Sequence, residues 1–208
     1  MRPQQFRFGD KEWPGGEGVL QVYAPVDVTV NRELAELIGR CRTAMDGAPV
    51  TPVDDAFLHV TLDVVAGRVA REVPPAERKE LVAALGRQLA GVPAYRGTAG
   101  SAMAYVSGVV VDISPAGPLI EIQRAVRGVI RNLCGDEACT WQQSKPHIGT
   151  HYCFSATDSD PWQRRLRDID PNHVPLRIDT VALVDVRPDN TTKRLTWTPV
   201  APLIRLAG

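Results

Sequence analysis

The chain has 208 residues, of which 44% are hydrophobic and 23% are charged, and 24 basic residues balance 24 acidic ones, so that the formal net charge is zero. This length and composition are typical of one globular domain, or of two small lobes that share a core. A neutral chain excludes a long basic surface for duplex nucleic acid, but it leaves room for a local phosphate pocket.

The N-terminal residues 1–17 contain no apolar run typical of a signal peptide. We interpret them as a polar arm that precedes a single domain over residues 18–208. No segment of the sequence is apolar for long enough to span a bilayer. The four cysteines are too few for a disulfide scaffold in a chain of this size. We therefore expect a cytoplasmic protein with free thiols and no membrane contact.

The first half of the chain alternates predicted strands and helices. Residues 19–26 have the composition of a strand. Asn31 is expected to cap a helix that ends at Gly47. The apolar residues of this helix follow one stripe: Leu34, Leu37, Ile38, Cys41 and Met45. A second strand is predicted over 57–65, and two prolines open a second helix over 74–91.

The second half contains more strands than helices. Strands are predicted over 94–99, 103–113, 145–154, 176–186 and 194–200, and the last two form an antiparallel pair across the turn 187–193. Helices are predicted from Pro118 to about Leu133 and, briefly, over 160–166. Single helices between hairpin-like strands predict an α+β fold rather than a doubly wound parallel sheet. A short strand–helix–strand arrangement occurs near His59 and again near His147, and this indicates two related lobes.

The stretch FLHVTLDV, residues 57–64, places one histidine in a strand that is otherwise apolar on one face. Strict alternation directs His59, Thr61 and Asp63 to the opposite, polar face. A histidine and a threonine two residues apart suit a phosphate, because the imidazole transfers a proton and the hydroxyl donates a hydrogen bond. A single motif of this length is common by chance and predicts little alone.

The stretch KPHIGTHY, residues 145–152, places His147 in a second strand of the same kind. With both motifs, residues 18–203 resemble the two-histidine (2H) phosphoesterases, which include RNA 2′,3′-cyclic phosphodiesterases and 2′-5′ RNA ligase-like proteins. Members carry two His-x-Thr/Ser strands, and the second is usually preceded by proline, as His147 is by Pro146. The resemblance implies a bilobed α+β fold in which two antiparallel-rich sheets with flanking helices surround a central cleft.

The resemblance also implies an activity. His59 and His147 would act as general acid and base in a metal-independent phosphodiesterase that needs no cofactor, although the sequence does not assign the two roles. The substrate would be a 2′,3′-cyclic phosphate or a 2′-5′ linkage, either at an RNA terminus or in a small nucleotide. The protein is expected to be a monomer. The alternative is a non-catalytic protein that binds nucleotides or RNA ends through a degenerate second motif.

The second motif departs from the family pattern at Gly149, where members carry threonine or serine. Strict alternation directs Thr150 to the opposite face, so a bulge, a backbone N–H or a different substrate would have to compensate. His151 is expected on the face of His147, where it would add a cationic donor. We therefore predict that Thr61, Thr150 and His151 bind the phosphate.

Two aromatic residues are possible substrate contacts. Tyr152 occupies a position where many family members carry arginine or tyrosine, and core packing is its alternative role. Trp141 precedes Lys145 and is suited to stack on a base, although it is equally compatible with a rim or core position.

A zinc site is a weaker interpretation of the same region. Its ligands would be Cys134, Cys139, His147, His151 and Cys153. The residue types suit zinc, but at roughly 3.3 Å per residue the two histidines are about 13 Å apart on an extended strand, too far for one tetrahedral ion. We predict no metal site.

Overall fold

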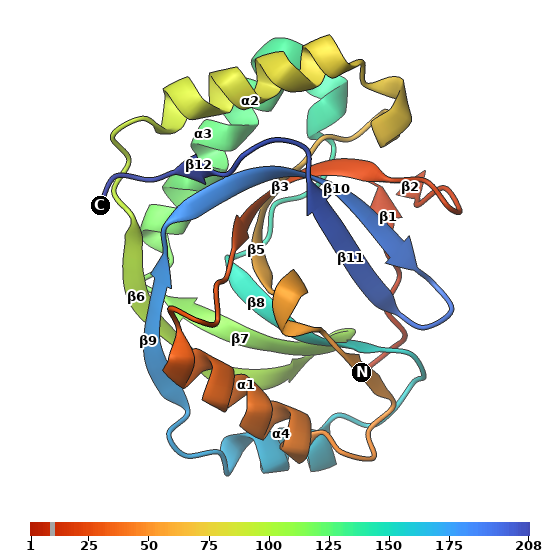
Figure 1. Cartoon of the computed structure of the whole chain (residues 1–208). Helices are drawn as coiled ribbons and strands as arrows, with labels where there is room; N and C mark the ends of the chain where they lie inside the picture. Colours follow the sequence, from red (N-terminus) through yellow and green to blue (C-terminus); the bar gives the residue numbers. More distant parts are fainter. Residues whose placement is uncertain (9–10) are drawn as a thin grey trace.

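The structure is a computed structural model that describes residues 1–8 and 11–208. Two five-stranded sheets, whose paired strands all run antiparallel, make up the body of the protein, and helices cover them at two opposite ends (Figure 1). This architecture confirms the predicted α+β fold.

The first sheet has the strand order β11–β10–β3–β5, and β12 also pairs with β10. Its strands are β3 (Val19–Pro25), β5 (His59–Val64), β10 (Thr180–Asp189), β11 (Arg194–Pro199) and β12 (Ile204–Arg205). The second sheet has the order β4–β8–β7–β6–β9. Its strands are β4 (Val50–Pro52), β6 (Tyr95–Tyr105), β7 (Gly108–Ser114), β8 (His147–Cys153) and β9 (His173–Ile178). The end strand β5 of the first sheet contacts β8 of the second.

Four α-helices flank the sheets. They are α1 (Arg32–Ala44), α2 (Pro75–Leu89), α3 (Gly117–Cys134) and α4 (Asp160–Arg167). Helices α2 and α3 pack together at one end, next to β12 and β5, while α1 and α4 lie at the opposite end, next to β9 and β6 (Figure 1). The stripe predicted for α1 is buried, and Cys41 within it is a core thiol as expected.

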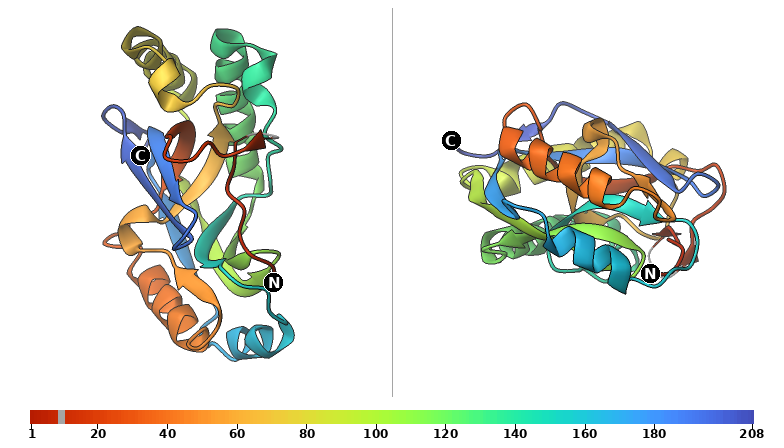
Figure 2. Two further views of the ribbon diagram at one scale, coloured as in Figure 1. Left: turned by 90° about the vertical axis from the view of Figure 1, so that its right-hand side faces the viewer. Right: turned by 90° about the horizontal axis from the view of Figure 1, so that it is seen from below.

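The N-terminal segment packs against both sheets. Its backbone follows β8, where the Gln4 amide donates to the Cys153 carbonyl, and it then forms the short pair β1 (Arg7–Phe8) and β2 (Lys11–Glu12). Figure 2 shows this segment running alongside β8 before it crosses to β3. Phe6, Phe8 and Trp13 are buried in a cluster with residues of β3 and β10. The segment therefore forms part of the wall between the sheets.

Several predicted boundaries were wrong. Residues 94–113 form the hairpin β6–β7, which turns at Val106–Ser107, because Gly100 lies in an irregularity inside β6 rather than in a turn. The strand predicted over 176–186 is split between β9 and β10, which belong to different sheets. Helix α1 starts after Asn31 as predicted, but the Asn31 side chain makes no cap. It bonds instead to the backbone N–H and carbonyl of Arg177 in β9.

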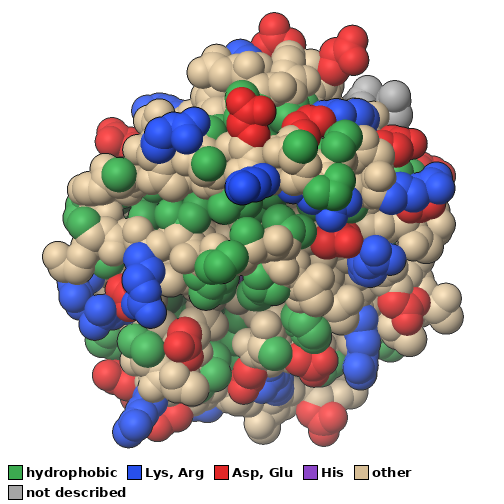
Figure 3. All heavy atoms as spheres, turned by 45° about the horizontal axis from the view of Figure 1, so that its top comes forward, with side chains coloured by type: hydrophobic (Ala, Val, Ile, Leu, Met, Phe, Trp, Pro, Cys, Tyr) green, Lys and Arg blue, Asp and Glu red, His purple; other side chains and the backbone are tan. Residues whose placement is uncertain are grey.

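The surface carries charges of both signs. On the face in Figure 3, Lys and Arg side chains alternate with Asp and Glu around a central band of apolar side chains, and no continuous basic stripe is visible. Among the described residues, none of the helices has the length and apolar character required to span a bilayer.

Candidate active site

A pocket of about 340 Å³ lies between the two sheets, and both histidine motifs line it. β5 contributes His59 and Thr61, and β8 contributes His147 and Gly149. The sequence prediction that two distant histidine strands share one cavity therefore agrees with the geometry. The loop before β8 and the N-terminal segment add further walls through Trp141 and Phe6.

The first imidazole is held on three sides. His59 Nδ1 lies 2.7 Å from the Phe57 carbonyl oxygen, and its ring stacks on Tyr23 with ring centroids 3.7 Å apart. Trp197 approaches edge-on and donates its indole N–H to the same carbonyl. Because a carbonyl only accepts, Nδ1 carries the hydrogen, and Nε2 is the nitrogen left to accept a proton.

The second imidazole is held by an equivalent bond. His147 Nδ1 lies 2.8 Å from the carbonyl oxygen of Lys145, again two residues earlier in the chain. The same reasoning assigns the hydrogen to Nδ1 and leaves Nε2 for chemistry. His147 is half-buried, whereas only 9% of His59 is exposed. The two rings thus have the same orientation within their motifs but different access to solvent.

The two histidines also differ electrostatically. Burial lowers the pKa of His59 to about 4, against the raising effect of the Phe57 carbonyl, and a positive charge on His147 lowers it further. His59 is therefore neutral near pH 7, with an unprotonated Nε2. Both rings line the same pocket, so this difference lies within one site.

Both motif strands contain a bulge three residues after the histidine. In the pairing of β5 with β3, Tyr23 lies opposite Thr61 and Val22 opposite Asp63, so Leu62 has no partner. In the pairing of β8 with β7, the register passes from Gly149 to His151 and leaves Thr150 without a partner. An extra residue at the same offset reverses the alternation of side chains in both strands.

The bulges correct the predicted faces. Val64 and Tyr152, five residues after each histidine, line the pocket with Thr61 and Gly149. Asp63, which strict alternation would direct to the cleft, is fully buried outside it and pairs with Arg127 of α3. For β8, a bulge was among the alternatives that we derived from Gly149 in the sequence, whereas β5 contains no glycine or proline that would signal one.

Two predicted phosphate ligands differ from the expectation: Thr150 does not line the pocket, and His151 lines it but is almost fully buried. Thr150 has no exposed surface, and its hydroxyl donates to the Val109 carbonyl rather than entering the pocket. His151 is 3% exposed and bonds through Nδ1 to the Thr150 hydroxyl. Burial, assisted by Arg42, lowers the pKa of His151 to about 4, so its imidazole is not the cationic donor that we expected. The bulge therefore exists, but it does not deliver Thr150 to the cleft.

Tyr152, rather than Thr150, brings a hydroxyl group to the pocket wall. Its hydroxyl oxygen lies 3.8 Å from the point where a Cβ atom on Gly149 would stand. Its ring packs edge-on against Phe6 of the N-terminal segment. Burial raises its pKa to about 12, so the hydroxyl keeps its proton at neutral pH. Among described residues the hydroxyl makes no hydrogen bond, and it is available as a donor.

The charge of the walls suits an anion. The described residues that line the pocket include no Asp or Glu, and Arg7 is the one Lys or Arg among them. Thr61 and Trp141 also line it, as predicted. Arg7 and Tyr23 were missed by sequence reasoning. The first lies in the segment interpreted as a polar arm, and the second is the cross-strand neighbour of Thr61, a register that the sequence does not reveal.

The zinc interpretation finds no support in the geometry. Among the described residues, no group of three or more His, Cys, Asp or Glu side chains is arranged to hold a metal ion. His173 begins β9, bonds to its neighbour Asn172 and does not line the pocket.

Solved structures of other proteins share this fold. TT0787 of Thermus thermophilus is 19% identical, with a TM-score of 0.65 over 91% of this chain and 98% of its own. A phosphoesterase is 17% identical, with a TM-score of 0.63 over 92% and 99%. LigT of E. coli in complex with NADP+ is 16% identical, with a TM-score of 0.61 over 92% and 99%, and LigT has also been solved with 3′-AMP, phosphate and ATP.

No protein-family model matches the sequence, and no curated protein is significantly similar to it. At these levels of identity the neighbours establish the fold. They confirm the fold that the two histidine motifs predicted. The chain therefore has the LigT-like fold of the two-histidine phosphoesterases.

Proposed function

We propose that the protein is a phosphodiesterase that hydrolyses a 2′,3′-cyclic phosphate by acid–base catalysis between His59 and His147. The observation that carries this proposal is the matched pair of imidazoles. Each donates from Nδ1 to the carbonyl two residues earlier, and each thereby presents Nε2 in the same pocket. Such paired orientation fixes the tautomers required for proton transfer.

The environments of the two rings support a division of roles. His59 is neutral near pH 7, so its Nε2 takes a proton from water as that water attacks phosphorus. His147 is then the general acid, which gives a proton from Nε2 to the ribose oxygen as the P–O bond breaks. The cyclic diester and one water thus become a phosphomonoester and a free hydroxyl, and the proton on His59 returns through solvent to restore His147.

Two hydroxyl groups then hold the non-bridging oxygens. Thr61 donates from the first motif, and Tyr152 donates in place of the side chain that Gly149 lacks. A preorganised donor to a developing oxyanion lowers the barrier by about 3 to 4 kcal/mol. Arg7, which also lines the pocket, supplies a formal positive charge for the phosphate. This chemistry requires neither a metal ion nor a cofactor.

A small nucleotide suits the pocket better than a long duplex. The volume of about 340 Å³ accommodates one nucleotide, and Trp141 on its wall is placed to stack on a base. LigT, which shares the fold, binds 3′-AMP and ATP in its crystal structures. The net charge of zero argues against long duplexes as partners. We propose a monomeric cytoplasmic enzyme that acts on cyclic mononucleotides or on the cyclic end of an RNA.

The test is hydrolysis of 2′,3′-cyclic AMP in buffer containing EDTA, followed by chromatography of 2′-AMP and 3′-AMP. We expect turnover that EDTA does not reduce. No turnover by the wild-type protein, combined with binding of 3′-AMP, would favour the alternative of a non-catalytic nucleotide or RNA-end binding protein. Cleavage or joining of a 2′-5′-linked dinucleotide in the same assay distinguishes a linkage-specific enzyme.

A further inference from the structure

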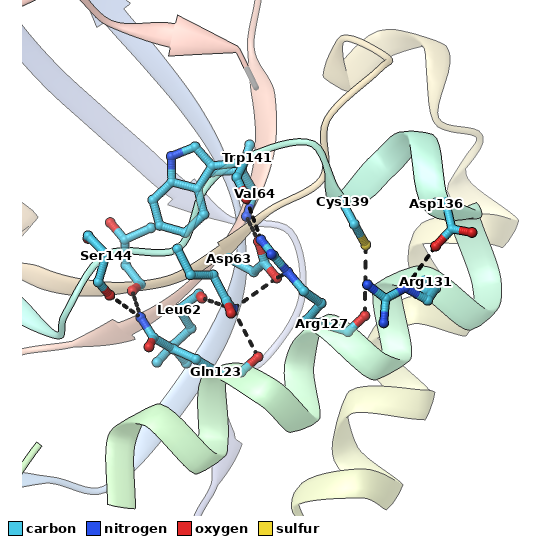
Figure 4. A network of polar contacts seen from close by, with 12 residues as sticks. Leu62, Asp63, Val64, Gln123, Arg127, Arg131, Asp136, Cys139, Trp141 and Ser144 are labelled. Atoms are coloured by element: carbon cyan, nitrogen blue, oxygen red, sulfur yellow. Dashed lines mark hydrogen bonds and ion pairs between the residues drawn. The ribbon is translucent and has the colours of Figure 1, made fainter. Parts of the chain in front are cut away.

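A buried polar cluster links the two histidine motifs outside the pocket. It consists of Asp63 in β5 and of Gln123 and Arg127 in α3 (Figure 4), together with Gln143 in the loop before β8. Asp63 has no exposed surface, and it receives two bonds from Arg127, at 2.8 and 2.9 Å, and one from Gln143 at 3.2 Å. Its carboxylate also accepts from the backbone N–H of Val64.

The polar groups of the cluster are hydrogen-bonded, but a gain in folding stability alone does not explain their burial. Burying an ion pair costs desolvation energy, and the attraction between the two charges often fails to recover it. Apolar residues of the same size often stabilise a core at least equally. Such a pair therefore needs a further reason, and fixing one arrangement of the chain is the best-attested one. The question becomes which segments the cluster holds.

On one side the cluster holds the first motif. The Gln123 amide donates to the Thr61 carbonyl at 3.1 Å, and the Gln143 amide donates to the Leu62 carbonyl at 3.1 Å. Thr61 lines the pocket, and Leu62 is the bulged residue of β5. The cluster thus fixes the bulge that separates the cleft-facing residues from the buried ones.

On the other side the cluster holds the loop that leads into the second motif. The Gln123 amide also donates to the Ser144 carbonyl at 3.2 Å, and Arg127 donates to the Trp141 carbonyl. The Lys145 carbonyl, which directly follows that of Ser144 in the chain, accepts the hydrogen bond from His147 Nδ1. Figure 4 shows Arg127 and Gln123 reaching from α3 to both segments. One amide therefore joins the backbone of the two motifs.

We propose that Gln123, with the Asp63–Arg127 pair and Gln143, is a positioning device that sets the placement of His147 relative to His59 and holds Trp141 at the pocket. This inference rests on the proposed function of the pocket and adds residues that touch no substrate. A shift of about 1 Å between reacting groups can cost about a hundredfold in rate, so a backbone link between the motifs has a direct kinetic consequence.

The test uses substitutions that keep side-chain volume and remove hydrogen bonds. Gln123→Met breaks the link from the α3 side, and Gln143→Met breaks it from the loop side. Gln163→Met is the control, because its side chain also bonds a backbone group across elements, the Ala104 N–H at 2.7 Å, and neither Gln163 nor Ala104 lines the pocket. Gln123→Met removes two hydrogen bonds, Gln143→Met removes three and Gln163→Met removes one, so the melting temperature of each variant is measured to account for a general loss of stability.

With 2′,3′-cyclic AMP, we expect Gln123→Met and Gln143→Met to lower kcat about ten- to a hundredfold while KM changes less than about threefold. Gln163→Met should keep the wild-type kcat. The imidazole C–H signals of His59 and His147 in NMR spectra should shift in the first two variants only. A kcat that falls equally in all three variants, or imidazole signals that match the wild type in Gln123→Met, would overturn the positioning role.

The NMR measurement separates this inference from the proposed function. If the wild-type protein hydrolyses no cyclic phosphate, the proposed function fails, while imidazole signals that respond to Gln123→Met and not to Gln163→Met still support the positioning of the two rings. If the wild type is active and the Gln123 and Gln143 variants are equally active, the positioning role fails and the proposed function stands.

Discussion

The hydroxyl of Tyr152 stands 3.8 Å from the position that a side chain on Gly149 would begin to fill. The bulge at Thr150 makes this possible, because it moves the residue five positions after His147 onto the same side as Gly149. The second motif thus lacks a hydroxyl side chain at its second residue after the histidine, Gly149, but the hydroxyl of Tyr152 lies next to that position.

Tyr152→Phe should therefore impair catalysis without impairing the fold. The ring and its contact with Phe6 remain, and the lost hydroxyl bonds no described residue. We expect kcat with 2′,3′-cyclic AMP to fall about a hundred- to a thousandfold, the usual effect of removing one oxyanion donor, with a melting temperature within about 2 °C of the wild type.

Gly149→Thr in the Tyr152→Phe background is the complementary experiment. A Cβ at Gly149 meets no backbone within 4 Å, so the substitution fits. We expect it to restore at least a tenth of the wild-type kcat, because the new hydroxyl takes the position usual in the family. A double variant no more active than Tyr152→Phe, or a Tyr152→Phe variant with full activity, would refute the role of the tyrosine hydroxyl.

His59→Gln and His147→Gln should each lower kcat on the order of 10² to 10⁴-fold, the typical contribution of a general acid or base. Glutamine keeps a hydrogen-bonding group of similar size but transfers no proton. His173→Gln is the control, since His173 is exposed at the start of β9. Steady-state assays with 2′,3′-cyclic AMP measure this loss. Full activity in either motif variant would exclude acid–base catalysis by the pair.

The sequence predicted most of the features that depend on the spacing of apolar and polar residues. The stripe of α1, the strands around His59 and His147, and their convergence on one cavity follow from residue spacing and from the resemblance of the two motifs. It could not predict which side chains share the cleft beyond the second residue of each motif, because the bulges at Leu62 and Thr150 are decided by pairing with β3 and β7. Asp63, which strict alternation directed to the cleft, was misplaced for that reason.

Contacts between distant segments were also beyond the sequence. The bonds of Arg127 to Asp63 and of Gln123 to Ser144 span 64 and 21 residues, and no local pattern selects those partners. The N-terminal segment carried a composition that we interpreted as a polar arm, yet Phe6, Phe8 and Trp13 are buried, because the space between the two sheets offers them an apolar surface.

The low pKa of His59 predicts the acid limb of the pH–rate profile. A base that titrates in the free enzyme near pH 4 remains unprotonated through pH 5, so kcat/KM for cyclic AMP should stay within about twofold between pH 7 and pH 5 on this account. An ordinary histidine base would lose most of its activity over this interval. A decline in kcat/KM with a midpoint near pH 6.5 would contradict the assignment of His59 as the base.

The same depressed pKa values make stability depend on pH. Folded His59 and His151 titrate near 4, below the ordinary value of 6.5, so the unfolded chain binds more protons and stability falls as the pH drops from 6.5 towards 4. Each group contributes on the order of 2 kcal/mol to the loss between pH 7 and pH 5. Urea unfolding of His151→Gln should show a correspondingly smaller difference between these two pH values, and a difference equal to that of the wild type would contradict it.

Arg7 provides the last prediction, since its segment is the part of the pocket wall that lies outside the two sheets. Because Arg7 lines the pocket with both histidines, its guanidinium should attract the phosphate, and Arg7→Gln should weaken binding of 3′-AMP about tenfold in calorimetry. Arg2→Gln is the matched control, because Arg2 lies in the same segment but lines a different cavity. Binding of adenosine, which lacks the phosphate, should not change in either variant. Equal affinity of wild type and Arg7→Gln for 3′-AMP would show that the phosphate is held by the hydroxyl and imidazole groups alone.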